Sequence, residues 1–285
     1  MSAKLRRTKA SVVGDISTYA LLVLYASFMC LPLLYAIVQS IKPYNELFIF
    51  PPRFFTKNPT FMSFRKLFDL TSASWVPFSR YVFNSVTNTI VGTVIHIFSA
   101  AMCSYPLAKN KFPGKKIIFK IVVWSLLFTG GVTEIPTYLV MSKLNIIDTY
   151  FAFWLPEISA TMGVFLLKQN MAEVPDAMVE AARIDGAGDW KILWSIMMPS
   201  VKPAWLTLAI FSFQRNWNAT ASSYIYTETL KTLPTALSQI TAEGGVARAG
   251  EAYAASVLMM IPPIIFFIFA QSSTVKTMAH AGIKG

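Results

Sequence analysis

Residues 16–41 read ISTYALLVLYASFMCLPLLYAIVQSI, a run that no charged side chain interrupts. A helix of about 20 apolar residues is long enough to cross the hydrocarbon core of a bilayer. The chain has 285 residues, of which 54% are hydrophobic and 14% are charged, whereas soluble domains carry about 25% charged residues. These proportions exclude both a soluble domain and a disordered chain. We therefore predict an all-α integral membrane protein.

Five further apolar runs follow the first one along the chain. Together they predict six transmembrane helices in a single domain of residues 1–285, namely residues 16–41, 81–108, 117–140, 149–167, 203–226 and 252–275. The net charge of +11 is scattered between these runs, which is typical of membrane loops and argues against nucleic acid as a partner. The chain has only two cysteines and two histidines, so we expect neither a disulfide scaffold nor a metal site.

The basic residues that flank the runs predict the orientation of the chain. They are dense in the N-terminal segment 1–15 and in the loop 109–116, whereas the loop 141–148 contains only Lys143. We therefore expect both termini in the cytoplasm, although the outer loop 42–80 would then carry six basic residues; the resemblance described below implies the inner membrane of a bacterium. A signal peptide is the alternative for the first run, which is too long for one and lacks a cleavage site.

The loop between the fourth and fifth predicted helices, residues 173–199, reads EVPDAMVEAARIDGAGDWKILWSIMMP and holds five of the fourteen acidic residues. We predict a short helix over 177–184, with Asp176 as its N-cap and Gly186 just past its end. A second helix starts at Asp189, and its apolar residues fall at helical spacing in one stripe: Trp190, Leu193, Trp194, Met197 and Met198. The segment is therefore a helix-turn-helix on the membrane surface, either docked on a partner or an amphipathic hairpin without one.

This segment resembles the EAA loop of bacterial ABC importer permeases. The resemblance is carried by Glu180-Ala181-Ala182, Gly186, Ile196 and Met198-Pro199, with Met198 where the family usually has Leu. Pro175-Asp176 and the run to Ala187 are similar to the carbohydrate, maltose-type branch, and 128–138 to a sub-branch for aldouronate and other acidic oligosaccharides. A Trp217-Asn218 pair and the 282–285 terminus fit as well. The resemblance implies a type I importer permease fold, with a cytoplasmic EAA coupling helix-turn-helix between helices 4 and 5.

The resemblance also implies partners and a mechanism. A second permease would pair with this chain as a heterodimer, a dimer of cytosolic ATPase subunits would dock the coupling loop, and an extracytoplasmic solute-binding protein would deliver an oligosaccharide. The ATPase-coupling residues would be Glu180, Ala181, Ala182, Asp185, Gly186, Ala187, Ile196 and Pro199. The chain has no phosphate-binding loop, so ATP and Mg would bind to the partner ATPase and this chain would be no enzyme. Its C-terminal tail, 277–285, is either frayed or reaches between the ATPase subunits.

Polar residues inside membrane helices are costly and point to a transport path. The candidate path residues are Asn84, Asn88, Glu134, Tyr138, Glu157, Arg215, Asn216, Trp217 and Asn218, most of which we place in the outer half of the membrane. Two structural alternatives stay open: Arg215 pairs with Glu134 or extends to the headgroups, and the asparagines bond between helices. His96 lies deeper and apart from the other candidates, and we expect it to be hydrogen-bonded between helices and not to act as a proton relay.

The expected substrate is an oligosaccharide that carries uronate groups, because Arg215 can bind a carboxylate with two hydrogen bonds. Neutral oligosaccharides or another solute are the alternatives. A stand-alone secondary transporter would show internal repeats with interrupted helices, and we find none in the sequence.

Overall fold

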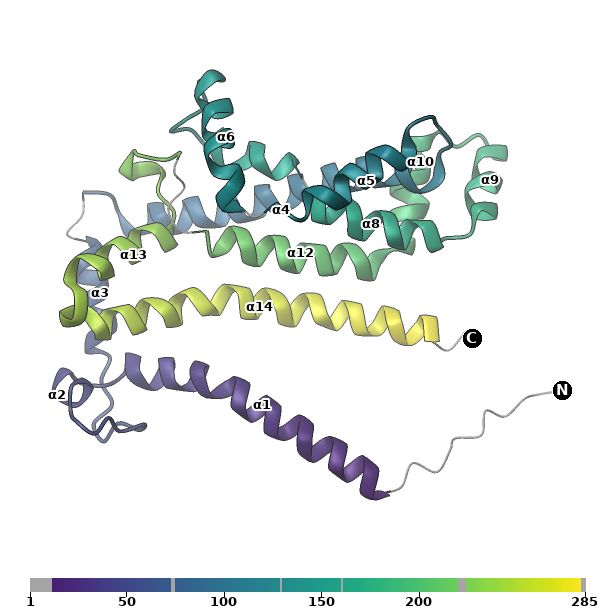
Figure 1. Ribbon diagram of the computed structural model, residues 1–285. Coiled ribbons are helices and arrows are strands. Elements are labelled where there is room, and N and C mark those ends of the chain that lie inside the picture. The colour runs from purple at the N-terminus through teal and green to yellow at the C-terminus, as the bar shows by residue number, and fades with distance from the viewer. Residues whose placement is uncertain (1–11, 73–74, 129, 160, 220–223, 283–285) are drawn as a thin grey trace. The chain divides into compact units, whose positions relative to one another are not determined.

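The computed structural model describes residues 12–72, 75–128, 130–159, 161–219 and 224–282, and the regular elements in these ranges are all helices (Figure 1). The all-α prediction is confirmed. The chain divides into two compact units, one of residues 1–69 and 244–258, the other of residues 70–243 and 259–285. Each unit is described by itself.

The smaller unit contains α1 (Val12–Ser40), α2 (Tyr44–Leu47), most of α3 (Met62–Ser72), η4 (Gly245–Arg248) and the start of α14 (Ala249–Gly282). Hydrogen bonds hold the loop after α1 in place. The carboxylate of Glu46 accepts hydrogen bonds from the Thr56 hydroxyl at 2.9 Å and the Lys57 backbone N–H at 3.0 Å, and the Tyr44 hydroxyl donates to Glu251. The apolar side chains of α1 are exposed along the helix, as a surface that faces lipid or another subunit must be.

The larger unit is built around α4 (Phe78–Lys109), which packs against α8 (Thr161–Glu173) and α12 (Lys202–Trp217) (Figure 1). Small residues bring α4 and α8 close together, because a Cβ on Gly163 would lie only 2.7 Å from the Cβ of Ala100. The Ser104 hydroxyl donates to the Val164 carbonyl at 3.1 Å across the same contact. Close approach through small residues and interhelical hydrogen bonds is how helices associate in membranes.

The other helices of this unit are α5 (Lys115–Ser125), α6 (Gly130–Lys143), α7 (Phe151–Trp154), η1 (Leu155–Ile158), α9 (Asp176–Ile184), α10 (Asp189–Ile192), η2 (Leu193–Met197), α11 (Met198–Ser200), η3 (Glu228–Leu230) and α13 (Leu233–Gly244). The predicted third span, 117–140, is divided between α5 and α6. Turn residues follow Ser125 and the second helix opens with Gly130 and Gly131, and glycine favours such a break. No single described helix therefore spans the membrane there.

Four helical stretches are long and apolar enough to cross a membrane, namely 16–40, 78–109, 151–173 and 233–271. A fifth counts if the pair 189–200 and 202–217, bent by 85°, forms one broken span. The count of six thus stays a prediction. The predicted fifth span, 203–226, is helical only to Trp217. The predicted tail is helical to Gly282 as part of α14, and 283–285 lie outside the described residues.

Candidate functional site

The predicted coupling loop is a helix-turn-helix that turns at Gly186. This glycine has φ +78°, a backbone conformation that glycine adopts readily. Its N–H donates to the Arg183 carbonyl at 3.0 Å, and the Ala187 N–H donates to the Ala182 carbonyl at 2.9 Å. These bonds satisfy carbonyls that the end of α9 leaves unpaired. The predicted position of Gly186 is confirmed.

Asp176 is not the N-cap that the sequence predicted. Pro175 occupies the cap position, α9 begins at Asp176, and no side chain caps the helix. The Asp176 carboxylate instead accepts a hydrogen bond from Lys109 at 2.6 Å, and this bond holds the pKa of Asp176 below its usual value. A long-range lysine therefore ties the carboxylate that local sequence assigned to the helix end.

The second arm of the loop runs through α10, η2 and α11 and then bends by 85° into α12. Its middle part, Leu193–Met197, is a π-helix. Four of the five residues of the predicted apolar stripe are buried or half-buried, namely Leu193, Trp194, Met197 and Met198. Trp190 is 58% exposed, but its ring contacts Phe98 of α4 and Trp194, so the predicted stripe forms one packed face.

Two contacts fasten the coupling loop to the end of α4. The Lys109 ammonium bonds Asp176, and the Tyr105 hydroxyl donates to the Asp189 carboxylate at 2.9 Å. Arg183 also bonds Asp189, at 3.0 Å. Both arms of the loop are thus attached to the helix at the centre of the unit.

A polar groove of about 450 Å³ lies between the end of α4 and α9, and it is lined by Lys109, Asn110, Lys111, Asp176, Val179, Glu180 and Arg183. Among the predicted coupling residues, Glu180, Ala181, Asp185, Gly186 and Pro199 are exposed, Ala187 and Ile196 are half-buried, and Ala182 is buried. Ile184 is 86% exposed at the tip.

The predicted path residues Glu157 and Arg215 meet inside the larger unit. Arg215 of α12 forms an ion pair through Nη2 with the Glu157 carboxylate of η1. The same Nη2 lies 3.3 Å from Nδ1 of His96 on α4, and this nitrogen lies 3.5 Å from the carboxylate. His96 thus has an interhelical partner, as expected, and the partner of Arg215 in these contacts is Glu157 and not Glu134.

The exposure of this cluster is uneven. The side chains of His96 and Glu157 are 3% and 11% exposed, whereas that of Arg215 is 54% exposed. The contacts just given use only Nη2 of a guanidinium that has five N–H donors. The ion pair thus holds one side of the guanidinium in place, and the other side is accessible to a ligand.

Gly92 makes room for this arrangement. A Cβ at Gly92 would lie 2.8 Å from Nδ2 of Asn216 and 3.3 Å from Cγ of Glu157. Asn216 is buried, and its Nδ2 has no hydrogen-bond partner among the described residues. Buried polar atoms of this kind also occur nearby on α4 and α12, at Thr89, Thr93 and Ser212. The interface between α4 and α12 is therefore polar at the depth of the ion pair.

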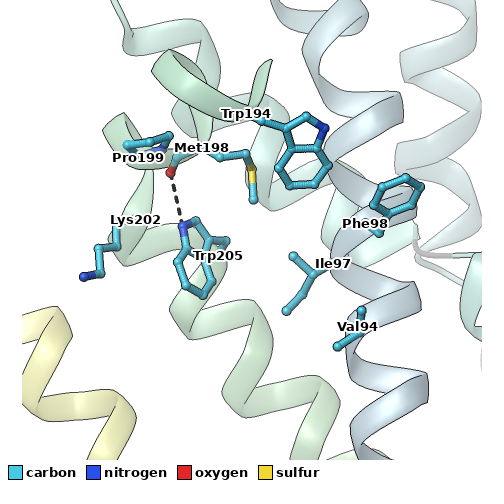
Figure 2. Close-up of a pocket in the computed structure, with 8 residues that line it drawn as sticks. All are labelled: Val94, Ile97, Phe98, Trp194, Met198, Pro199, Lys202 and Trp205. Carbon is cyan, nitrogen blue, oxygen red and sulfur yellow. Dashed lines mark hydrogen bonds between the residues drawn. The ribbon is translucent and has the colours of Figure 1, made fainter. Parts of the chain in front are cut away.

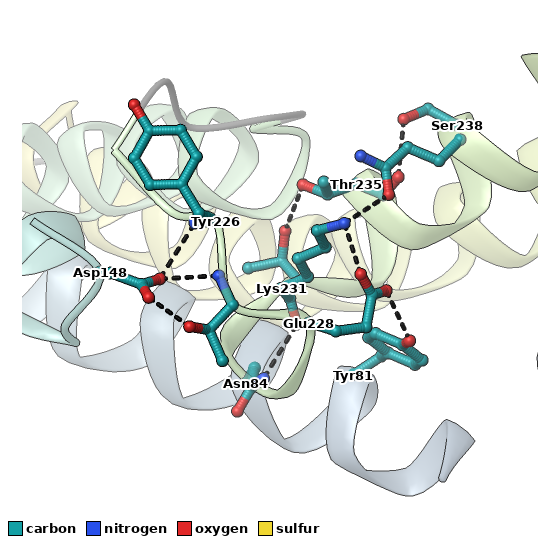
Figure 3. Close-up of polar contacts among 11 residues, drawn as sticks. Tyr81, Asn84, Asp148, Tyr226, Glu228, Lys231, Thr235 and Ser238 are labelled. Carbon is teal, nitrogen blue, oxygen red and sulfur yellow. Dashed lines mark hydrogen bonds and ion pairs between the residues drawn. The ribbon is translucent and has the colours of Figure 1, made fainter. Parts of the chain in front are cut away.

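Asn84 has a different place. Its amide donates to the carbonyls of Thr229 and Lys231, both at 2.9 Å, and its oxygen accepts from the Tyr150 hydroxyl at 2.8 Å. Nearby, the Tyr81 hydroxyl donates to Glu228 at 2.8 Å (Figure 3). The first turns of α4 thus hold the segment 228–231, and the partners of Asn84 are this segment and Tyr150, not a second spanning helix.

The remaining predicted path residues are dispersed. Asn88 is buried on α4, and Asn218 is exposed after the end of α12. Trp217 is buried, and its indole N–H donates to the Met259 carbonyl at 3.0 Å, so it packs within the fold. Glu134 and Tyr138 lie on α6, where the Tyr138 ring stacks on Tyr224 with centroids 6.4 Å apart.

A second hollow, of about 480 Å³, lies where α11 and α12 meet α4 (Figure 2). Its lining is Val94, Ile97, Phe98, Trp194, Met198, Pro199, Lys202 and Trp205. The Trp205 N–H is already bonded to the Met198 carbonyl at 3.1 Å. Apart from Lys202 and the bonded Trp205 the lining is apolar, so the hollow offers few of the polar groups that orient a sugar.

Sequence reasoning missed Gly92, Asp148, Tyr224 and Tyr226, and it did not predict which residues contact His96. For Gly92 and the tyrosines no local pattern exists, because their roles depend on helices distant in the chain.

Comparisons with known proteins agree with this arrangement. Residues 16–279 match the family described as binding-protein-dependent transport system inner membrane component. Protein LplC of Bacillus subtilis (strain 168) is 30% identical over 99% of this chain and 98% of its own length. The arabinooligosaccharides transport system permease protein AraQ of Halalkalibacterium halodurans is 30% identical over 89% of this chain and 91% of its own. A solved structure of a bacterial ABC transporter involved in the import of the acidic polysaccharide alginate has a TM-score of 0.76 at 21% identity, and the match covers 93% of this chain and 98% of that one.

Proposed function

Since the chain belongs to the family of inner membrane components of binding-protein-dependent transport systems, we propose that it is the permease subunit of an ATP-driven oligosaccharide importer that accepts uronate-bearing sugars. The observation that carries the substrate class is Arg215, which Glu157 anchors and whose side chain is 54% exposed. The sugar names of relatives support an oligosaccharide.

The depth of Arg215 supports a ligand-facing role. Its neighbour His96 lies twelve residues from Asn84 and nine from Tyr105 on α4, which is about 18 and 14 Å along a helix. The cluster therefore sits near the middle of the membrane. A guanidinium is strongly unfavourable against lipid at this depth, so its exposed half faces an aqueous path or another subunit.

Carboxylate recognition fits this arginine. Guanidinium binds carboxylates through charge-assisted hydrogen bonds and often through two at once. Glu157 is bound to one side of the Arg215 guanidinium and neutralises part of its charge. A uronate carboxylate would therefore bind mainly through directional hydrogen bonds to the guanidinium and less through long-range electrostatic attraction. Neutral oligosaccharides, such as those in the name of AraQ, are the second candidate substrate class.

The coupling loop supports attachment to an ATPase. Exposed Glu180, the groove beside it and the exposed Ile184 form a surface that fits a protein partner. We infer that this surface docks into the ATPase dimer, which binds ATP and Mg. A second permease, which completes the path and covers apolar helix surface, and an extracytoplasmic binding protein complete the heterodimeric importer. Both termini then lie in the cytoplasm.

The test is uptake by the complete complex in proteoliposomes with ATP inside. Loaded with its binding protein and an alginate tetrasaccharide, the complex should take up sugar, and Arg215→Gln should lower uptake of this ligand more than that of an arabinose tetrasaccharide. Equal losses would assign Arg215 to structure. Uptake by this chain without any ATPase would contradict the importer itself.

A further inference from the structure

The turn at residues 224–227 holds two tyrosines in fixed positions. Ile225, between them, is buried against Met141 and Ala152. Tyr226 is 62% exposed, and its ring points away from Asp148 (Figure 3). One buried residue thus anchors the turn, Tyr224 packs half-buried against the same cluster, and the Tyr226 side chain lies toward the surface.

Asp148 fixes the backbone of this turn. Its carboxylate accepts hydrogen bonds from the backbone N–H groups of Tyr226 at 3.0 Å and Thr227 at 2.8 Å, and from the Thr227 hydroxyl. Its own N–H donates to the Tyr224 carbonyl at 2.8 Å. Side chains on a backbone held in this way lose little conformational freedom when a ligand binds.

A third tyrosine joins the two from another helix. The rings of Tyr138 and Tyr224 are stacked at an interplanar angle of 27°. A hydrogen bond links the side chains of Tyr138 and Tyr226, and this bond raises the pKa of Tyr226. Burial, and after it the charge of Glu134, raises the pKa of Tyr224, so its hydroxyl stays a hydrogen-bond donor. The three tyrosines form an aromatic platform with hydroxyl groups at its edge.

The tyrosine platform lies at the opposite end of the unit from the coupling loop. The segment 228–231 that follows it is bound by Asn84 and Tyr81 near the start of α4, whereas Tyr105 near its end binds the coupling loop. Asn84 and Tyr105 are twenty-one residues apart, about 32 Å along a helix and close to the thickness of the hydrocarbon core.

We propose that Tyr138, Tyr224 and Tyr226 form a subsite at the outer mouth that receives a sugar ring of the oligosaccharide before it reaches Arg215. Tyrosine offers a rigid amphipathic surface at low entropic cost, and the apolar faces of sugar rings stack on such surfaces while their hydroxyls bond to phenols. Glu134 nearby disfavours a carboxylate here, so the subsite binds the ring and not its charge. This inference rests on the proposed import of oligosaccharides.

The test compares two double variants in the complete complex in nanodiscs or proteoliposomes. Tyr138→Ala with Tyr226→Ala should raise the half-saturating concentration of sugar-loaded binding protein about tenfold, the factor expected for one lost ring contact. The loss should be equal for alginate and arabinose tetrasaccharides. Tyr138→Phe with Tyr226→Phe keeps the rings and should stay within about twofold, because one bond to a neutral group is weak. Tyr19→Ala, an exposed tyrosine on α1, is the matched control.

Direct contact is measured in the wild-type complex by saturation-transfer NMR, which should show transfer from aromatic protons to the ring protons of either tetrasaccharide. An unchanged half-saturation in the alanine variant, or absence of transfer, overturns the inference. A lowered maximal rate at unchanged half-saturation also overturns it, because the tyrosines would then be structural. If wild type itself takes up no oligosaccharide, the proposed function fails and not the subsite alone. If Arg215→Gln lowers the uptake of acidic and neutral sugars equally, the proposed preference for acidic sugars fails, whereas the proposal of a tyrosine subsite is unaffected.

Discussion

The turn of the coupling loop gives the sharpest prediction, the replacement of Gly186 by a residue with a Cβ. Nothing lies within 4 Å of the Cβ position, so the substitution causes no clash and its cost is purely in the backbone. At φ +78° an L-residue pays about 1–2 kcal/mol. Relief of this strain requires opening of the bonds from Gly186 to Arg183 and from Ala187 to Ala182, which would misalign the two arms.

A strain of about 1–2 kcal/mol corresponds to a factor of roughly 5 to 30 in the population of the native turn. We therefore expect Gly186→Ala to lower ATP-coupled uptake by about that factor, and Gly186→Val to lower it further because β-branched residues are more restricted. Gly186→Asn should retain most activity, because asparagine tolerates this conformation. Membrane insertion should not change.

The assay is sugar uptake per ATP hydrolysed by the reconstituted complex, with the amount of assembled complex measured in parallel. Gly188→Ala is the matched control, because Gly188 has φ −72° and is equally open. If Gly186→Val couples ATP hydrolysis to uptake as well as Gly188→Ala does, the conformation of the turn at Gly186 is not needed for coupling and the reasoning is refuted. If all variants lose assembly together, the turn is needed for folding and not for coupling.

Three further outcomes are expected. The Cβ of Gly92→Ala should clash with Asn216 and Glu157 and reduce uptake of the acidic tetrasaccharide. Gly131→Ala is the control, because the space around its Cβ is open, and it should have no effect on uptake. Equal effects of the two substitutions would contradict this prediction. Asp148→Asn should weaken the turn at 224–227 and raise the half-saturating concentration of sugar-loaded binding protein without lowering the maximal rate. An unchanged half-saturating concentration would show that the hydrogen bonds of Asp148 do not hold the tyrosines in place. The hydrogen bond from the Thr227 side chain holds the pKa of Asp148 below its ordinary 3.8. The ionised carboxylate therefore stabilises the turn fully above pH 3.8. This stabilisation should be lost only as the pH falls through the lowered pKa. Amide hydrogen exchange of the turn between pH 7 and pH 3 measures this, and loosening already at pH 6 would be inconsistent with it.

Local sequence was sufficient for features fixed by local chemistry. Gly186 was predicted as the end of a helix because only a few residues adopt its conformation, and the second arm begins at Asp189 as predicted. Asp176 failed as a cap because the competing partner, Lys109, is sixty-seven residues away. The stripe on the second arm was predicted from helical spacing and packs on α4, whereas the π turn at Leu193–Met197 could not be read from that spacing.

The candidate site could be predicted as a set of residues but not as a geometry. Polar residues in apolar runs flagged Glu157 and Arg215 correctly as unusual. Their pairing depends on how η1, α4 and α12 pack, which no spacing along the chain reveals. The same holds for Asn84, whose amide is bound to carbonyls at 229 and 231, and for the platform, whose tyrosines come from α6 and a later turn.

One helix connects the three functional regions of the larger unit. The first turns of α4 bind the segment that follows the tyrosine platform, its middle carries His96 and Gly92 beside Arg215, and its end binds the coupling loop through Lys109. A continuous hydrogen-bonded helix resists stretching, and packed interfaces switch between discrete arrangements more easily than they deform. A displacement of the coupling loop along α4 therefore has to appear either at the ion pair or at the outer turn. Among the described residues, the polar atoms Oγ1 of Thr93 and Nδ2 of Asn216 have no hydrogen-bond partner, so a rearrangement at the interface between α4 and α12 breaks fewer hydrogen bonds than one at the outer turn.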